Sequence, residues 1–522
     1  MSRIATAAIC LAIALLTYFQ FPGHTWLQQD TQIYTPILEH QSDPTVLAND
    51  PIAMQRAHVA FTVYDETARL LRTMTGSTFH TVVALEQIAA RALGIWGLFL
   101  LAGGGTTGWL VALICSLGAY IAGPAVLTME YEPSPRAIAL PLVICAMGLA
   151  TNARFMAAGI IAAIAVLYHP PTALPFWAVF AAVVAVQRRW VALIPLGVAA
   201  GILAGSASFE TEPGQTSALF SRLTPLDEQL QRMRANYAWI SAWPASRIIS
   251  SIAVFAGAVV TFWRNRVESL KEPRWFLLGL AALGIASMPL SWLLLEQGKW
   301  ALLPQAQPMR LLLFGSLALQ FGATVAGAAA LHKNRRLESA GWFVLAYLLP
   351  LTPLDWRRAA VCLALGAGTT LAGRFAPAVA LVAFLAIPIA GGVQNYPHLH
   401  TPELEQLSNW ASSSTPKDAV FLFPDSGRSL DPGLFRTEAL RAIYVDWKGG
   451  GQINFFRDFA GLWWSRWQET NARGFTPADL PRYEALGITY VVLHPSHRLP
   501  FPPLFENARY LVYTASPALQ SR

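Results

Sequence analysis

Acidic side chains that suit proton transfer lie in the first polar segment of the chain. Asp30 follows directly after an apolar N-terminal stretch, and Asp50 lies further along the same segment. A carboxylate at the mouth of a membrane helix is well placed to take the proton of an acceptor hydroxyl. Both residues also have structural alternatives, because Asp often caps a helix and Asn49-Asp50-Pro51 is typical of a turn. We take Asp30 as the first candidate for a catalytic base and Asp50 as the second.

A second polar segment, residues 129–136, contains Glu130 and Glu132 as an acid-x-acid pair. In an extended loop, two carboxylates at this spacing point the same way and can share a hard divalent cation such as Mg²⁺ or Mn²⁺. Acidic residues are also common at helix mouths where no metal binds. The pair is therefore a candidate metal site with a structural alternative.

Three further side chains are candidates for binding a phosphate group. Arg136 ends the second polar segment, Arg310 ends a third at residues 305–310, and His169 precedes Pro170-Pro171 at the end of an expected helix. An arginine fork matches the oxygens of a phosphate. The alternatives are structural, since a cation at a helix end also reaches for water and a histidine before proline often just ends a helix.

Charge and motifs exclude several classes of function. The net charge is +7, but residues 395–522 hold 12 basic and 12 acidic side chains, so the excess belongs to the rest of the chain. It gathers in short loops near residues 187–190, 264–274 and 332–336, which is the positive-inside pattern of a membrane protein rather than a nucleic-acid surface. We find no G-x-x-x-x-G-K-[ST] loop for a nucleotide, so bond formation would require an activated donor. The four cysteines lie in apolar runs and predict neither disulfides nor a thiolate metal site.

The composition predicts a polytopic α-helical membrane protein, because 54% of the residues are hydrophobic and only 13% are charged. Apolar runs of membrane length give about thirteen candidate transmembrane helices. They lie near residues 3–21, 81–101, 108–127, 136–150, 155–168, 172–187, 190–208, 247–263, 275–295, 310–331, 339–353, 359–373 and 376–391.

These helices divide the chain into a transmembrane domain, residues 1–394, and a C-terminal soluble domain, residues 395–522. The positive-inside rule places the N-terminus in the cytoplasm and the soluble domain outside the inner membrane. The first outer loop, residues 22–80, is expected to hold interfacial helices near 31–41 and 54–74. In the soluble domain we expect helices near 402–413, 455–470 and 478–486 and strands near 419–424, 441–447 and 488–494, which predicts a small α/β fold.

Taken together, these features resemble the GT-C superfamily of membrane glycosyltransferases. Asp30 matches the acidic residue that the superfamily carries after its first helix, and Glu130-Tyr131-Glu132 looks like the acid-x-acid motif of oligosaccharyltransferase catalytic subunits. The C-terminal region looks like a domain of uncharacterised bacterial membrane proteins, through the stretches 415–421, 435–436 and 441–448. The Trp-Trp-Asp-Tyr-Gly motif of oligosaccharyltransferases is absent from the sequence, which argues against transfer of a whole oligosaccharide to asparagine.

The resemblance implies an inverting transfer of a sugar from a polyprenyl-phosphate donor to an extracytoplasmic glycan, lipid or protein. Asp30 would accept the proton of the acceptor, and Arg136 or Arg310 would hold the donor phosphate. A flippase or transporter of lipid-linked substrates is the main alternative, and it should carry ionisable groups at the centres of its helices. A catalytically inactive membrane scaffold is the third interpretation.

Overall fold

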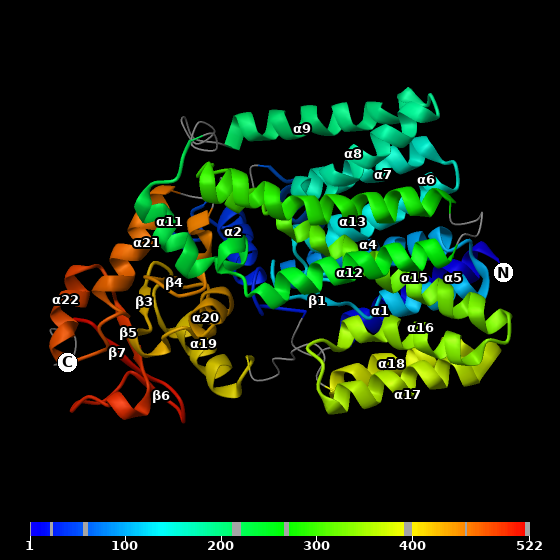
Figure 1. Ribbon diagram of the computed structural model, residues 1–522. Helices are drawn as coiled ribbons and strands as arrows, with labels where there is room; N and C mark the ends of the chain where they lie inside the picture. The colour runs from blue at the N-terminus through cyan, green and yellow to red at the C-terminus, as the bar shows by residue number, and fades with distance from the viewer. Residues whose placement is uncertain are drawn as a thin grey trace.

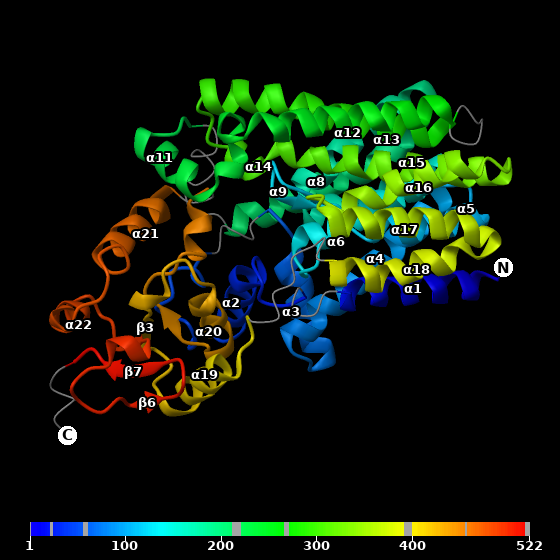
Figure 2. The same ribbon diagram turned by 60° about the horizontal axis from the view of Figure 1, so that its bottom comes forward.

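The computed structural model describes residues 2–20, 25–55, 61–210, 221–265, 271–390, 399–454 and 457–516. A bundle of roughly parallel and antiparallel helices makes up one end of the molecule, and a smaller region with a β-sheet makes up the other (Figure 1). The N-terminus lies at the far end of the bundle from the sheet, and the two views agree on this arrangement (Figure 2).

A helix is present at each of the thirteen ranges predicted from apolar runs. These helices are α1 (Arg3–Phe19), α4 (Phe79–Leu101), α5 (Gly105–Cys115), α6 (Pro135–Thr151), α7 (Phe155–Tyr168), α8 (Pro170–Val186), α9 (Ile194–Glu210), α12 (Ala245–Arg264), α13 (Lys271–Ser291), α15 (Leu313–His332), α16 (Arg336–Leu348), α17 (Trp356–Ala372) and α18 (Ala376–Ala390).

Helical stretches that are long and apolar enough to cross a membrane occur six times among the described residues. They are Phe79–Leu101, Trp190–Ser208, Ala245–Arg264, Glu272–Gln297, Leu303–His332 and Trp356–Ala390. Shorter apolar helices such as α1, α6, α7 and α8 pack beside them. The chain is therefore a polytopic α-helical membrane protein, as its composition predicts.

The helix predicted over residues 108–127 is wrong in its second half. Helix α5 ends at Cys115, and a short hairpin of β1 (Tyr120–Ile121) and β2 (Val126–Leu127) follows. Gly118 has a φ of +78°, a left-handed conformation that glycine adopts without strain and that a helix does not allow. The apolar run continues here because the hairpin packs on the core, and hydrophobicity alone did not distinguish the two structures.

Helices α4 and α6 pack backbone to backbone through glycines. A Cβ added to Gly97 would lie 2.5 Å from the carbonyl oxygen of Ile144, and one added to Gly148 would lie 2.5 Å from that of Gly97. Small residues allow such close approach of membrane helices. This contact matters for the site because Arg136 lies in the first turn of α6. Side chains of α4 bind the loop that leads into α6.

The first outer loop contains two helices, α2 (Thr31–Ser42) and α3 (Tyr64–Thr75). The first agrees with the range predicted from sequence. The second begins ten residues later than predicted, since Pro51–Met54 form turns, and residues 56–60 of the predicted helix lie outside the described residues. A further outer segment contributes α11 (Pro225–Arg234), which a Thr224–Asp227 capping box begins.

The C-terminal region contains a mixed five-stranded sheet in the order β4-β3-β5-β7-β6. Strands β3 (Val420–Leu422), β4 (Ala442–Ile443) and β5 (Tyr490–Leu493) are parallel, whereas β7 (Leu511–Thr514) pairs antiparallel with both β5 and β6 (Phe505–Glu506). Helices α19 (Pro402–Ser414), α21 (Arg457–Glu469) and α22 (Leu480–Ala485) agree with the predicted ones. Helix α20 (Asp431–Ala439) and the last two strands were not predicted.

The sheet region and the first outer loop share one hydrophobic core. Ile33, Ile37 and Ile52 of the loop pack in the same buried cluster as Val491 and Trp463 of the C-terminal region. Helix α20 lies on α2, and α11 contacts α21, so both outer segments of the bundle are covered by the C-terminal region. The loop that carries Asp30 is thus held between the helices and the sheet.

Candidate functional site

Glu132 holds the loop that carries Asp30. Its Oε1 accepts hydrogen bonds from the backbone amides of Gln28 (2.6 Å) and Gln29 (2.8 Å) and from the Thr31 hydroxyl (2.5 Å), and its Oε2 accepts one from the Asp30 amide (2.8 Å). These four bonds fix the backbone that leads into α2, and a carboxylate beside the N-terminus of a helix also interacts favourably with the helix dipole.

The side chain of Asp30 does not cap the helix that it precedes. Asp30 occupies the N-cap position of α2, but its carboxylate makes no capping hydrogen bond. The helix-cap alternative is thus wrong for the side chain. Instead, Oδ1 accepts a hydrogen bond from Lys448 Nζ at 3.1 Å, and 42% of the Asp30 side chain is accessible.

Three cations surround this carboxylate. Its enclosed position raises the pKa of Asp30, but the positive charges of Lys448, Arg136 and Arg310 outweigh this effect and hold the pKa well below its usual range. Asp30 is therefore ionised at neutral pH. The site combines one accessible carboxylate with a strongly positive environment.

Arg136 lies at the start of α6 and is 8% exposed. Its Nε donates to Glu130 Oε1 at 2.7 Å, which is its one hydrogen bond within the described residues. Arginine stays protonated at neutral pH, so within the described residues the charged guanidinium has its two Nη groups left to bind an anion.

Arg310 lies in a 3-10 turn, Pro308–Leu312, that follows the left-handed residue Gln307. Its guanidinium lies 5.5 Å from the centre of the Tyr237 ring, and its buried Nε has no hydrogen-bond partner among the described residues. An anionic ligand would supply the hydrogen-bond partner that this Nε lacks.

His169 ends α7 and caps α8, where its Nδ1 accepts a hydrogen bond from the Thr172 amide at 3.2 Å. Burial and then the charges of Arg136 and Arg310 lower the pKa of His169 to about 3. The imidazole is therefore neutral at pH 7. With Nδ1 accepting, the hydrogen lies on Nε2, so His169 can offer a phosphate a neutral hydrogen bond but no charge.

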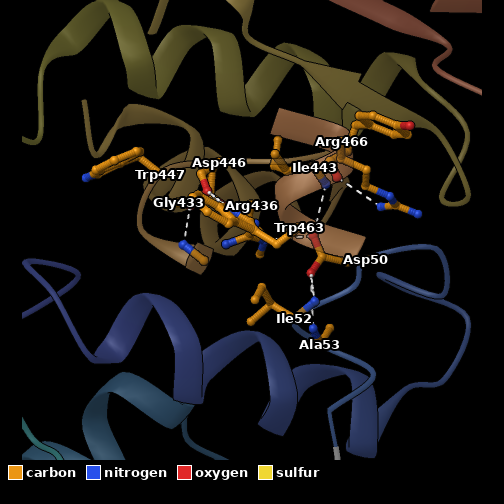
Figure 3. A network of polar contacts seen from close by, with 12 residues as sticks. Asp50, Ile52, Ala53, Gly433, Arg436, Ile443, Asp446, Trp447, Trp463 and Arg466 are labelled. Carbon is orange, nitrogen blue, oxygen red and sulfur yellow. Dashed lines mark hydrogen bonds and ion pairs between the residues drawn. The ribbon is translucent and has the colours of Figure 1, made fainter. Parts of the chain in front are cut away.

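Asp50, the second candidate for the base, is not accessible. Its side chain is fully buried, and each carboxylate oxygen accepts two hydrogen bonds: Oδ1 from the amides of Ile52 and Ala53, and Oδ2 from Arg436 Nε and the Ile443 amide (Figure 3). With every lone pair occupied, Asp50 cannot accept a proton from a substrate. The geometry gives it a structural role in joining the first outer loop to the C-terminal region.

Glu130 and Glu132 do not form a shared metal site. Glu130 is paired with Arg136, whereas Glu132 is saturated by four donors from the loop of Asp30. No group of three or more metal-binding side chains occurs within the part of the chain that the structure describes. The residues present therefore do not fit the Mg²⁺ or Mn²⁺ site predicted from their spacing.

Two site residues on α4 were not predicted. Gln87 donates to the backbone carbonyls of both Glu130 and Glu132 at 3.0 Å, and Arg91, which is 1% exposed, donates to the carbonyl of Glu130. These contacts pull the acid-x-acid loop down onto the bundle. An arginine inside an apolar helix is unusual in a membrane protein, and this signal was available in the sequence.

Lys448 was also missed as a site residue. It follows β4 in the C-terminal region, and its distance of 418 residues from Asp30 along the chain gives no sign that the two side chains meet. The stretch 441–448 was noted in the sequence only for its resemblance to uncharacterised proteins. Structure was needed to place it at the site.

Comparison with known proteins supports the fold. Two structures of ArnT from Cupriavidus metallidurans match over 99% of both chains: the apo state at 12% identity and a TM-score of 0.50, and the form bound to undecaprenyl phosphate at 13% and 0.53. The arabinofuranosyltransferase AftD from Mycobacteria matches 98% of this chain and 36% of its own at 13% identity, with a TM-score of 0.45. The chain therefore shares its overall fold with ArnT.

A sequence family described as a domain of unknown function, DUF6798, matches residues 402–469. This range includes Arg436, Asp446 and Lys448. A comparison with curated proteins found no sequence match.

Proposed function

We propose that this protein is a glycosyltransferase that moves a sugar from a polyprenyl-phosphate donor to an acceptor outside the membrane. One observation carries the proposal: in an ArnT-like fold, an accessible carboxylate at the mouth of the helical bundle is surrounded by Lys448, Arg136 and Arg310. A carboxylate suits proton transfer, and guanidinium groups suit a phosphate. One of the similar ArnT structures holds undecaprenyl phosphate, which is the kind of anion that these cations would bind.

In the proposed reaction, an acceptor hydroxyl attacks the anomeric carbon of the donor sugar. A carbon–oxygen bond forms on one face, the bond to the phosphate oxygen breaks on the other, and the configuration is inverted. Asp30 takes the hydroxyl proton, and the bonding electrons leave with the phosphate. Because its pKa is low, Asp30 is a weak base, so most of the acceleration must come from cations that stabilise the leaving phosphate.

Arg310 is the main phosphate ligand in this proposal, because its buried Nε lacks a hydrogen-bond partner within the described residues. Arg136 contributes its Nη groups and His169 its neutral Nε2–H. The reaction is written without a divalent cation, since the predicted metal ligands have other partners. Neither the donor sugar nor the class of acceptor (glycan, lipid or protein) enters the proposal.

The proposal includes a placement in the inner membrane with thirteen transmembrane helices. The N-terminus would lie in the cytoplasm, and the first outer loop and C-terminal region would lie outside. This orientation rests on the basic loops near residues 187–190, 264–274 and 332–336. A polyprenyl donor would then enter from the bilayer and an acceptor from the water phase.

A flippase for lipid-linked substrates is the second candidate, and Arg91 within α4 is the observation that favours it, since intramembrane charges often mark a transport path. However, Arg91 is 1% exposed and is occupied by the carbonyl of Glu130, which gives it a structural task. The accessible charges lie at the mouth of the bundle instead.

The test is turnover of radiolabelled polyprenyl-phosphate sugars by the purified protein in proteoliposomes, supplied with envelope acceptor extracts. Wild type should release the sugar from its carrier, and Asp30→Asn should reduce the rate by about 100-fold or more, the usual contribution of a general base. Asp43→Asn is the matched control, since Asp43 lies in the same loop and its carboxylate binds Thr45 and Lys417 at the surface. Movement of intact donor across the bilayer without release would support the flippase instead.

A further inference from the structure

Among the described residues, Lys448 is the cation that the C-terminal region brings to the Asp30 carboxylate. Its side chain is 18% exposed, and its Nζ lies 3.1 Å from Asp30 Oδ1. The residue belongs to a turn between β4 and the 3-10 segment Gly449–Asn454. A lysine on a flexible stem acts as a mobile point charge, unlike the rigid fork of an arginine.

A buried chain of ion pairs fixes the backbone of this turn. Arg436 of α20 is fully buried and donates from Nε to Asp50 and from Nη2 to Asp446 at 2.7 and 2.5 Å (Figure 3). The Asp446 carboxylate in turn accepts a hydrogen bond from the Gly449 amide at 2.9 Å, and the Asp446 backbone carbonyl accepts one from Trp463 Nε1. Asp446 and Gly449 bracket Lys448, so the backbone of the lysine is held, while its ammonium group lies at the end of a flexible four-carbon stem.

Close packing adds to this fixation. A Cβ on Gly433 of α20 would lie 2.0 Å from Gln32 Oε1 of α2, so the two helices are in direct contact two residues after Asp30. Gln32 also donates to the Leu27 carbonyl at 2.6 Å. The turn of Lys448 and the loop of Asp30 are therefore fixed to the same frame.

The charges of the proposed reaction create a need that Lys448 can meet. A phosphodiester donor carries one negative charge, whereas the departing polyprenyl phosphate is a monoester with a charge of about −1.5 to −2. Arg136 is already paired with Glu130. Asp30 becomes neutral when it takes the acceptor proton, and at that moment Lys448 loses its partner.

We infer that Lys448 exchanges partners during the reaction, from the Asp30 carboxylate to the oxygens of the leaving phosphate. This inference rests on the proposed function. The proton that neutralises Asp30 releases the ammonium group, and the new negative charge on the phosphate attracts it. The Lys448 ammonium group thus moves with the negative charge from Asp30 to the phosphate. The C-terminal region therefore supplies a phosphate-binding residue in addition to covering the first outer loop.

The experiment measures binding of undecaprenyl phosphate, the product mimic, to the purified full-length protein in nanodiscs. Lys448→Gln should weaken binding by about 10- to 100-fold, the value of one charge-assisted hydrogen bond. Lys448→Arg should restore most of the affinity. Lys417→Gln is the matched control, because Lys417 also joins the C-terminal region to an aspartate of the first outer loop, at an exposed site 3.2 Å from Asp43.

A second background separates partner exchange from simple charge attraction. Asp30→Asn mimics the protonated carboxylate and leaves Lys448 without its partner. The loss caused by Lys448→Gln should therefore be larger in the Asp30→Asn background than in the wild type. Equal losses in the two backgrounds would overturn partner exchange, and unchanged binding by Lys448→Gln would overturn the whole inference. Failure of the wild type itself to bind undecaprenyl phosphate would count against the proposed function instead.

Discussion

The fully buried carboxylate of Asp50 provides the sharpest test of how the first outer loop is held. Asparagine has the same shape, but one of its two oxygens is replaced by a donor NH₂ group. Both oxygens of Asp50 face only donors, two each, so either orientation of the amide leaves the NH₂ opposed by two donors. Asp50→Asn therefore breaks two hydrogen bonds and removes one counterion of Arg436.

The size of the effect follows from these contacts. A buried donor left unsatisfied costs about 1–3 kcal/mol, and breaking a buried ion pair costs about 3–5 kcal/mol. We expect Asp50→Asn to destabilise the attachment of the loop to the C-terminal region by about 3–5 kcal/mol. A local opening free energy that falls by this amount speeds amide exchange by more than about 100-fold.

Hydrogen–deuterium exchange of peptides that cover residues 44–55 and strand β4 is the measurement. Asp43→Asn is the control, because Asp43 pairs with Lys417 at the surface and should have little effect. The reasoning is refuted if both variants exchange at the same rate. Loss of turnover by Asp50→Asn with unchanged exchange would return Asp50 to the list of candidate bases.

Three other predictions concern packing, loop position and pH. Gly97→Ala should force α4 and α6 apart and lower the thermal unfolding temperature in detergent, whereas Gly197→Ala, which has nothing within 4 Å of its Cβ, should not. Glu132→Gln should impair turnover more than overall folding. Its NH₂ group would face backbone amides of the Asp30 loop, which now donate to the Glu132 carboxylate. The charges around Asp30 lower its folded pKa below the usual value of about 3.9, so the stability that they contribute is present above that pH and is lost as pH falls through the folded pKa. Lys448→Gln removes one of these charges and should move the acid limb of the pH–rate profile upward.

Each of these predictions has a contradicting result. Equal unfolding temperatures for the two glycine variants would mean that α4 and α6 tolerate separation. Normal turnover by Glu132→Gln would mean that Asp30 does not depend on that carboxylate for its position. An acid limb that stays in place in Lys448→Gln would mean that Lys448 does not control the protonation of Asp30.

The helices of the bundle could be predicted from sequence because the bilayer demands long apolar segments. The exception, residues 116–127, is buried by protein instead, and there hydropathy cannot distinguish a hairpin from a helix. Asp30, Arg136 and Arg310 could be found because charges at helix mouths stand out against apolar runs. The position of both arginines near the Asp30 carboxylate could be established only from the structure.

Other features of the site could not be predicted, since they depend on contacts between distant segments. Glu130 and Glu132 are two residues apart, yet one pairs with Arg136 and the other binds the loop of Asp30. Their loop is held by Gln87 and Arg91 of α4, which the sequence could not show. The separate roles of Asp30 and Asp50 likewise depend on which groups the C-terminal region brings to each.

The pairing of Asp50 with Arg436 also has a consequence for how the protein is made. The two residues are 386 positions apart, so the ribosome has delivered nearly the whole bundle to the membrane before Arg436 is translated. At synthesis rates of about 5–20 residues per second, Asp50 waits roughly 20–80 s for its partner. During that interval the first outer loop lacks its anchor and Asp30 lacks Lys448. A nascent or truncated chain therefore has the helices of the bundle without the contacts that complete the site, and these contacts form only when the last quarter of the polypeptide has folded.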